Sequence, residues 1–396
     1  MWLWFKFGKL DLMSSPNPLH IIRSHQAQIN CVAFSEDNER LYSADIEGWV
    51  TLTSTRTLRP LARWRAHTES TLAVQEWNES IVTHGRDHKL HVWSRTVQPI
   101  VVAESVNVER IVSAPPLLYS LDVNALNFCK FDLFAKVGEN TAVLAVPNLI
   151  DSNYIDLWDL PARDRLHAAV GKQYLQESGA DASNDPRLKL GAAMTVHVFE
   201  AVPPDQGAPR LNLLVGYEDG SVILYRREQD NRLKTVEGQG WTLLWRVREH
   251  VESVMAMALA PGHNFALSVS ADAKVVKYDL SKESSSTAPS VVYATKLPGN
   301  GALSIRSDSR VCAIGSWNGK VQLYSTKSFK SLGTLTYHKD GCYALAFAQV
   351  IRPEDVQGDD DMDPDEIVSR GWWLGSGGKD TRICIWPLKS FERGET

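Results

Sequence analysis

The chain has 396 residues, of which 43% are hydrophobic and 22% are charged, and its formal net charge is −5 at pH 7. This composition is that of an ordinary globular protein, with enough apolar side chains for a large core. Because the chain as a whole is not basic, direct binding to nucleic acid is not expected.

Residues 1–13 are expected to form an extension that precedes the folded domain. The stretch is apolar and aromatic but contains Lys6 and Lys9, so it is too short and too charged to span a bilayer. No small-residue cleavage site follows it, which argues against a signal peptide. Two interpretations stay open: a segment that the fold does not need, and a tail that docks a partner.

Seven segments of the chain share one pattern, in which a turn residue is followed six positions later by the end of an alternating strand. The strand ends, mostly aromatic, are Thr53, Trp93, Trp158, Tyr225, Tyr278, Tyr324 and Trp386. The turn residues, mostly acidic, are Glu47, Asp87, Ser152, Asp219, Asp272, Asn318 and Asp380. Successive strand ends are 40 to 67 residues apart, which fits four-stranded blades with loops of different lengths. The pattern predicts an all-β, seven-bladed propeller over residues 14–390, followed by a tail at 391–396.

The segment Leu19-His20-Ile21-Ile22-Arg23 precedes the first blade and is expected to complete the last one. An open ring of blades would leave two unpaired sheet edges. We therefore expect this segment to be the outer strand of the blade that ends at Trp386. Such pairing would close the ring and hold the two ends of the domain together.

The five cysteines are widely spread and include no C-x-x-C pair. Most fall inside predicted strands, where a free thiol behaves as a small hydrophobe. Their number and spacing indicate a reducing compartment rather than a disulfide framework. The sequence Asn78-Glu79-Ser80 is then expected to be a hairpin turn rather than a glycan acceptor.

A histidine stands upstream of four of the turns, at His25, His67, His250 and His338. With the dipeptide Trp158-Asp159, these marks make the chain resemble WD-repeat propellers. In that family the turn aspartate accepts hydrogen bonds from the turn backbone and from the histidine, which is linked to a Ser or Thr and to the strand aromatic.

The resemblance implies one such structural network in each of several blades. Asp87 is matched with His67 and Trp93, Asp272 with His250 and Tyr278, and Asp380 with His338 and Trp386; the first blade departs, with Glu47 and Thr53 in those places. The third and sixth blades lack the histidine and are expected to depend more on packing. The predicted network residues are His25, Glu47, His67, Asp87, Trp93, Trp158, Asp219, His250, Asp272, His338, Asp380 and Trp386.

Residues 351–370 form an acidic insertion with a net charge of −6. A run of this kind cannot bury much apolar area, so we expect a solvated, disordered loop, with docking on a basic partner as the alternative. Its residues Asp359, Asp360 and Asp361 lack the glycine and distal glutamate of a calcium loop, and we consider them candidate partner contacts.

Two other groups are candidate partner contacts. Arg59, Arg63 and Arg65 form a basic stretch early in the chain. Trp372 and Trp373 lie next to the acidic insertion, where aromatic side chains can anchor a partner. The alternative for the two tryptophans is that they cap the propeller core.

No pattern in the sequence indicates catalysis, a metal or a cofactor. Gly378-Lys379 resembles the end of a phosphate-binding loop, but Asp380 stands where Ser or Thr is required. His84, His88 and His91 could suggest zinc, but they straddle a tight hairpin and no cysteine joins them. A nucleophile motif G-x-S-x-G is also missing from the sequence. We therefore expect a protein that is not an enzyme.

A closer resemblance rests on whole phrases of the sequence. The runs Ile22-Arg23-Ser24-His25 and Trp64-Arg65-Ala66-His67, and the turn Gly216-Tyr217-Glu218-Asp219-Gly220, are similar to those of the fungal ASTRA-associated protein 1 family. That family is related to the animal G-protein-beta-like propellers. The similarity extends over essentially the whole predicted propeller and thins in the loops.

This resemblance implies a noncatalytic scaffold in the nucleus, with the cytoplasm as a second location. The implied partners are the Tel-two/Tti co-chaperone complex, the AAA+ ATPases of chromatin remodelling complexes and the phosphatidylinositol-3-kinase-related proteins. The chain would act as one copy within such a hetero-complex, without nucleic acid or membrane. The alternative is a generic peptide-reading propeller, such as a histone-tail reader or ubiquitin-ligase receptor, which needs an acidic or aromatic pocket at the channel mouth.

Overall fold

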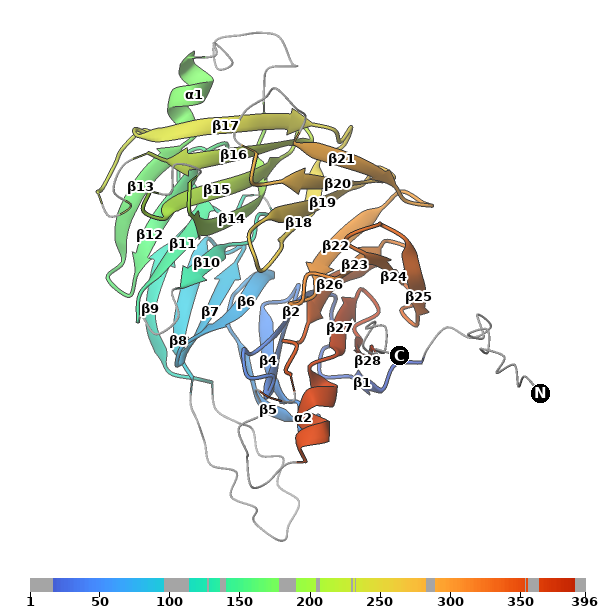
Figure 1. Ribbon diagram of the computed structural model, residues 1–396. Coiled ribbons are helices and arrows are strands. Elements are labelled where there is room, and N and C mark those ends of the chain that lie inside the picture. Colours follow the sequence, from blue (N-terminus) through green and yellow to red (C-terminus); the bar gives the residue numbers. More distant parts are fainter. Residues whose placement is uncertain are drawn as a thin grey trace, which may run out of the picture.

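A computed structural model describes residues 17–95, 114–126, 128–135, 140–177, 190–203, 207–228, 231, 233–282, 289–352, 354 and 363–388. The strands of this part form seven four-stranded antiparallel sheets. The sheets follow one another around an axis in chain order (Figure 1). The predicted all-β propeller with seven blades is therefore confirmed. The predicted extension at 1–13 and tail at 391–396 lie outside the described residues.

The first three blades run from the inner to the outer strand in chain order. Blade 1 contains β2 (Ile29–Phe34), β3 (Arg40–Asp45), β4 (Trp49–Ser54) and β5 (Pro60–Arg65). Blade 2 contains β6 (Thr71–Trp77), β7 (Ser80–Gly85), β8 (Lys89–Ser94) and β9 (Leu117–Asp122). Blade 3 contains β10 (Asp132–Ala135), β11 (Ala142–Pro147), β12 (Ile155–Leu160) and β13 (Asp164–Val170).

Blades 4 to 6 repeat this order. Blade 4 contains β14 (Ala193–Ala201), β15 (Arg210–Tyr217), β16 (Ser221–Arg227) and β17 (Trp241–Arg248). Blade 5 contains β18 (Val254–Leu259), β19 (Phe265–Ser270), β20 (Lys274–Asp279) and β21 (Ser290–Ala294). Blade 6 contains β22 (Asn300–Ile305), β23 (Val311–Ser316), β24 (Lys320–Ser325) and β25 (Ser331–Thr336).

Blade 7 takes strands from both ends of the chain and closes the ring. Its strands are β26 (Cys342–Phe347), β27 (Trp373–Gly378), β28 (Ile383–Pro387) and β1 (His20–Ile22). β1 pairs antiparallel with β28, with Ile21 opposite Cys384, and the inner strand β26 contacts β2 of blade 1. In Figure 1 the blue β1 accordingly lies beside the red β28. The predicted closure by an N-terminal strand is confirmed.

The core lies between neighbouring blades, because each sheet presents apolar side chains to the next. At the seam between blades 7 and 1, Ile29, Leu41 and Ile383 form one buried cluster. The glycine-rich strand β27 fits this seam, since a Cβ on Gly377 would lie 2.5 Å from Cγ2 of Ile29. These glycines thus have a packing role, and the likeness of Gly378 to a phosphate-binding loop is incidental.

In the described residues, two short helices interrupt the strands. The helix α1 (Lys172–Glu177) follows blade 3, and α2 (Pro364–Arg370) lies within the acidic insertion before β27. Asp363 caps α2 by accepting a hydrogen bond from the Asp365 amide at 3.0 Å. The expectation of a disordered loop over all of 351–370 is thus wrong for its last turn, because capping and the buried Arg370 order it. Asp359, Asp360 and Asp361 lie outside the described residues.

All five cysteines are buried and none is in a disulfide. Burial raises the pKa of Cys312 and Cys342 to about 12, so these thiols are protonated and behave as apolar groups. Asn78 forms the turn between β6 and β7 with a left-handed φ of +50°. In the part of the chain that the structure describes, no helix has both the length and the apolar character to cross a membrane.

Candidate functional site

Three blades carry the same buried chain of hydrogen bonds. In blade 2, His67 Nδ1 lies 2.9 Å from Asp87 Oδ1 and His67 Nε2 lies 2.9 Å from Thr83 Oγ1. Trp93 Nε1 donates to the same Thr83 oxygen at 3.0 Å. One proton arrangement satisfies every atom: Trp93 donates to Thr83, Thr83 to His67, and His67 Nδ1 to Asp87. The network links the loop before the blade, its second and third strands, and its turn.

Blades 5 and 7 repeat this chain with other residues. In blade 5, His250 lies 3.1 Å from Asp272 and 2.7 Å from Ser268, which is bonded to Tyr278 Oη. In blade 7, His338 lies 3.0 Å from Asp380 and 2.8 Å from Ser376, which accepts from Trp386 Nε1. Each of these aspartates also accepts a backbone N–H from the residue after the histidine, namely Val251 or Lys339. The structure thus brings together the residues that the WD-repeat resemblance assigns to these blades.

In blades 2 and 7, a glycine two positions before the aspartate makes room for the histidine. A Cβ on Gly85 would lie 2.3 Å from the His67 ring, and a Cβ on Gly378 would lie 2.6 Å from His338 Nδ1. Contacts this short are not possible, so a larger side chain at Gly85 or Gly378 would require the histidine of that blade to shift. Blade 5 has Ser270 at the equivalent position and keeps the bond between His250 and Asp272.

The first blade uses a different carboxylate from the one predicted. His25 Nδ1 lies 2.7 Å from Asp45 Oδ2, and Ser43 Oγ lies 2.8 Å from His25 Nε2. Asp45 also accepts the backbone N–H groups of Glu47 and Trp49, both at 3.0 Å. Asp45 is buried, whereas the Glu47 side chain is exposed. The assignment of Glu47 to the network is therefore wrong.

The spacing from the histidine does not by itself separate the two acids of this turn. Asp45 follows His25 by 20 residues, as Asp87 follows His67. Counting back from the strand end selects Glu47 instead, because Thr53 stands there without the indole that anchors the pattern in blade 2. Glu47 follows His25 by 22 residues, as Asp272 follows His250, so only the reach of the carboxylate to the ring distinguishes the two acids.

The remaining blades hold their turns without a histidine. In blade 3, the buried Asp156 accepts from Asn148 Nδ2 and from the Ala169 amide, both at 2.8 Å. The predicted Trp158 is half-buried, with the Arg165 guanidinium 5.9 Å from its ring centre. In blade 4, Asp219 accepts from the Ser221 amide at 2.8 Å and from Arg246 at 2.9 Å. An arginine thus occupies the role that histidine has elsewhere.

The Ser376, His338 and Asp380 side chains follow the bonding order of a serine hydrolase triad. Ser376 is fully buried, and its oxygen already accepts the indole N–H of Trp386. The equivalent Ser43 and Ser268 are buried as well. Since no substrate carbonyl can approach these hydroxyls, the arrangement is structural.

His67, Asp87 and His91 bring their ligand atoms within 4.8 Å of one another, which raises the question of a metal. Both nitrogens of His67 already have partners, Asp87 and Thr83. The rings of His67 and His91 are stacked at 4.8 Å with an angle of 15° between them, so their nitrogens do not converge on one point. This geometry is unsuited to tetrahedral coordination.

Of the predicted basic contacts, Arg63 and Arg65 lie on β5, the outer strand of blade 1, and Arg59 directly precedes it. Arg59 and Arg65 are exposed, and the Arg63 guanidinium stacks over the Trp49 ring at 4.5 Å. Trp372 is half-buried under the Arg306 guanidinium at 4.8 Å. Trp373 is only 7% exposed and belongs to the core, so its assignment as a partner contact is wrong. Of the five residues, Arg59 and Arg65 are the most available to a partner.

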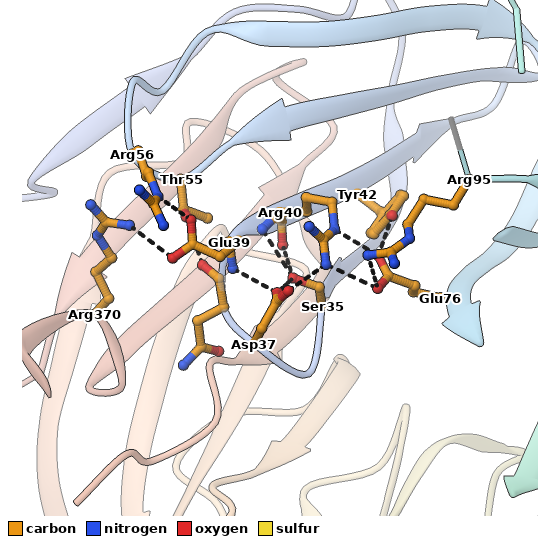
Figure 2. A network of polar contacts seen from close by, with 11 residues as sticks. Ser35, Asp37, Glu39, Arg40, Tyr42, Thr55, Arg56, Glu76, Arg95 and Arg370 are labelled. Atoms are coloured by element: carbon orange, nitrogen blue, oxygen red, sulfur yellow. Dashed lines mark hydrogen bonds and ion pairs between the residues drawn. The ribbon is translucent and has the colours of Figure 1, made fainter. Parts of the chain in front are cut away.

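A continuous polar network joins blades 7, 1 and 2 (Figure 2). At its centre, Glu76 of β6 accepts from Arg40 Nε at 2.9 Å, from Arg95 at 3.3 Å, and from the hydroxyl of Tyr42. Burial and the Glu76 carboxylate raise the pKa of Tyr42, so its hydroxyl stays a donor. The two basic side chains neutralise Glu76 where blades 1 and 2 meet.

The same network reaches the acidic insertion. Glu39 pairs with Arg56 of its own blade and lies 3.6 Å from Arg370, at the end of α2 (Figure 2). Arg370 is buried and also pairs with Glu366 at 2.7 Å. The described end of the insertion is thus anchored to blade 1 through Arg370.

The inner strands of blades 3 to 6 surround a hollow of about 400 Å³. Its lining includes Asp132, Phe134 and His197. His197 Nδ1 lies 3.3 Å from Asp132, and its Nε2 donates to the Met257 carbonyl at 3.1 Å. Asp132 also accepts the Val198 amide at 2.8 Å. The only acidic group that lines the hollow among the described residues is therefore already bonded within the protein.

The geometry of the blades agrees with a comparison of sequences. The model of the ASTRA-associated protein 1 family matches residues 18–346, which extend from the closing strand β1 into the inner strand of blade 7. The chain belongs to this family.

Several relatives in this family match the chain over most of its length. A protein of Verticillium alfalfae is 30% identical over 409 residues, covering 94% of this chain and 93% of its own. A protein of Aspergillus niger is 30% identical over 443 residues, covering 94% and 97%. A protein of Schizosaccharomyces pombe is 25% identical over 400 residues, covering 95% and 100%. Each of these relatives is named ASTRA-associated protein 1.

Proposed function

We propose that this propeller is a noncatalytic scaffold subunit of an ASTRA-like complex. The observation that carries the proposal is membership of a family whose proteins are named for association with ASTRA, over most of the chain. The fold supports it, because a closed ring offers rigid surfaces that lose little conformational entropy when partners bind.

The polar groups of the ring favour a scaffold over an enzyme. The Ser and His side chains of blades 1, 5 and 7 are buried and bonded to one another, and each histidine is also bonded to an aspartate, which suits a structural role. A charge-assisted hydrogen bond of this kind contributes about 1.5 to 3 kcal/mol to stability. Turnover assays on the purified chain provide the independent test of this part of the proposal.

The partners that we propose are the Tel-two/Tti co-chaperone complex, the AAA+ ATPases of chromatin remodelling complexes and the phosphatidylinositol-3-kinase-related proteins. The proposed location is the nucleus, with the cytoplasm as a second location. We propose further that one copy of the chain acts within each complex. A peptide-reading propeller is the less favoured candidate, because the acidic group Asp132 in the central hollow is already engaged by His197.

Affinity capture from fungal nuclear extract tests the proposal. The full chain, tagged at one end, should retrieve the co-chaperone and AAA+ proteins in amounts well above an untagged control. Recovery of cullin adaptors or nucleosomes in their place would contradict it. Fluorescence microscopy of the tagged chain in fungal cells tests the location, and exclusion from the nucleus would count against that part.

A further inference from the structure

Four large apolar side chains project from neighbouring loops at one end of blades 2 and 3. Leu126 is 70% exposed, Phe128 61%, Leu149 51% and Ile150 92%. Leu126 and Phe128 lie between β9 and β10, and Leu149 and Ile150 lie in the turn between β11 and β12. Both connections are at the same end of the strands, since neighbouring strands of each sheet run in opposite directions. We call these four residues the apolar ridge.

Buried asparagines hold the apolar ridge in place. Asn124 Oδ1 accepts the Leu126 amide at 3.1 Å, and Asn148 Oδ1 accepts the Ile150 amide at 3.1 Å. Asn124 Nδ2 donates to the Asn148 carbonyl at 2.8 Å, and Asn148 Nδ2 donates to the buried Asp156 at 2.8 Å. The two loops are thus joined through their own side-chain amides, which fixes the backbone that carries the ridge.

The turn of blade 2 belongs to the same surface. The Val123 amide donates to the His88 carbonyl at 3.1 Å, and the Ala125 amide donates to His88 Nδ1 at 3.3 Å. Arg86, in that turn, stacks its guanidinium over the Phe128 ring at 4.8 Å. Turns of two blades and the connection between them therefore form one preorganised surface.

The charged side chain next to the apolar ridge is Arg86, and it has no acidic partner among the described residues. Among the described residues no carboxylate pairs with the Arg86 guanidinium, and its Nε is shielded from solvent without a hydrogen-bond partner. Asp151, the nearest acid in the chain to the ridge, accepts the Asn153 amide within its own turn at 3.0 Å. A partner that supplies a carboxylate would meet this unpaired cation, and apolar side chains alone would leave it unsatisfied.

We propose that the apolar ridge docks a partner protein whose surface presents an apolar face bordered by a carboxylate, and that this carboxylate pairs with Arg86. A second copy of the chain is a poor occupant. A symmetric dimer through the ridge would bring two Arg86 side chains into one interface, and the acid beside the ridge, Asp151, already accepts the Asn153 amide of its own turn. For the identity of the partner, this inference rests on the proposed function.

Capture of named proteins by matched variants provides the test. Ile150→Asp and Arg86→Glu alter the ridge and its cation, and Val202→Asp is the control, because Val202 is also exposed but follows β14 at the opposite end of the strands. In nuclear extract, both ridge variants should retrieve at least one of the co-chaperone or AAA+ proteins at least about tenfold less than the wild type. Val202→Asp should retrieve them normally, and all three should keep the wild-type thermal midpoint. Arg86→Lys, which keeps the positive charge, should retrieve more of the partner protein than Arg86→Glu but less than the wild type.

The outcomes separate the ridge from the proposed function. Normal capture by Ile150→Asp would overturn the ridge and leave the proposed function intact. If the wild type retrieves none of these proteins, the proposed function fails. The docking proposal for the apolar ridge is then tested with a photo-crosslinking residue placed at position 150 of the full chain. A crosslink to a peptide with apolar and acidic side chains supports it. The docking proposal is overturned if the residue crosslinks to a basic peptide, if it crosslinks to a second copy of the chain, or if it forms no crosslink.

Discussion

Asn38 and Gln349, which are 311 positions apart, exchange two hydrogen bonds across the seam between blades 1 and 7. Asn38 Nδ2 donates to the Gln349 carbonyl at 2.7 Å, and the Gln349 amide donates to Asn38 Oδ1 at 2.8 Å. The side-chain amide thus pairs as a strand backbone would. This contact is a second closure of the ring, in addition to the pairing of β1 with β28.

Asn38 should be hard to replace, because it also adopts a left-handed φ of +59°. We expect Asn38→Ala to lower the free energy of unfolding by about 2 to 4 kcal/mol, since it removes both bonds and forces alanine into that conformation. Asn38→Gly loses the bonds but tolerates the conformation, so its loss should be smaller. Urea unfolding of the three proteins measures this, and equal stability of all three would contradict the closure.

The two acidic residues of the first turn should differ sharply. Asp45→Ala removes the partner of His25 and of two backbone N–H groups, and should lower the free energy of unfolding by at least about 1.5 to 3 kcal/mol. Glu47→Ala changes an exposed side chain and should stay within about 0.5 kcal/mol of the wild type. Thermal midpoints of both variants, with Asp87→Ala as a second network variant, provide the measurement. A larger effect at Glu47 than at Asp45 would restore the assignment made from sequence.

The sequence predicts the ring well because the repeat is carried by local chemistry. A polar turn, an alternating strand and a closing aromatic recur at fixed spacing, so seven blades and the closing strand can be counted without knowing any contact between them. The error at Glu47 is also local, since two acids stand two positions apart and only the three-dimensional reach of His25 distinguishes them. The blade networks of His67, His250 and His338 depend on residues whose spacing the sequence displays.

Other features depend on contacts between loops that have no periodic signal. The pairing of Asn38 with Gln349 and of Glu39 with Arg370 joins segments from opposite ends of the chain. The acidity of residues 351–370 indicates solvation, yet the burial of Arg370 orders the end of that segment. The apolar ridge was missed for the same reason, because Leu126 and Ile150 become one surface only through Asn124 and Asn148.

Acid should destabilise the protein through His84. Its ring is fully buried, and neither nitrogen has a hydrogen-bond partner. Burial lowers the pKa of His84 to about 3. Since the unfolded chain takes up this proton near pH 6.5, the native state loses up to about 1.4 kcal/mol for each pH unit below that value, down to about pH 3.

The variant His84→Leu should remove this part of the acid sensitivity. It should also be at least as stable as the wild type at pH 7, because an apolar side chain replaces an unpaired polar one. Urea midpoints at pH 7 and pH 5 measure both effects, and His20→Leu, in β1, is the control for loss of a histidine elsewhere. If the urea midpoint of His84→Leu falls as much between pH 7 and pH 5 as that of the wild type, a group other than His84 causes the acid sensitivity.

His197 should have the opposite effect of His84 on the pH dependence of stability, because its contribution is lost as the pH rises. Both of its nitrogens face acceptors, the Asp132 carboxylate and the Met257 carbonyl, so both bonds form only when the ring carries two protons. Burial by itself would lower the pKa of His197, but the charge of Asp132 and these bonds outweigh it, and the pKa is raised. The pairing therefore stabilises the protein fully below the unfolded value of about 6.5, and this stability is lost as pH rises through the folded pKa.

The variant His197→Gln isolates this contribution when it is compared with the wild type at each pH. The difference in thermal midpoint between the two proteins should be largest near pH 6 and should shrink toward pH 9. Asp132→Asn, which removes the carboxylate but keeps its shape, should likewise abolish the pH dependence of the pair. A difference that stays constant, or that grows as pH rises, would show that His197 is neutral in the folded protein. Because His197 connects β10, β14 and β18 around the hollow, its deprotonation should loosen the inner wall of blades 3 to 5 first.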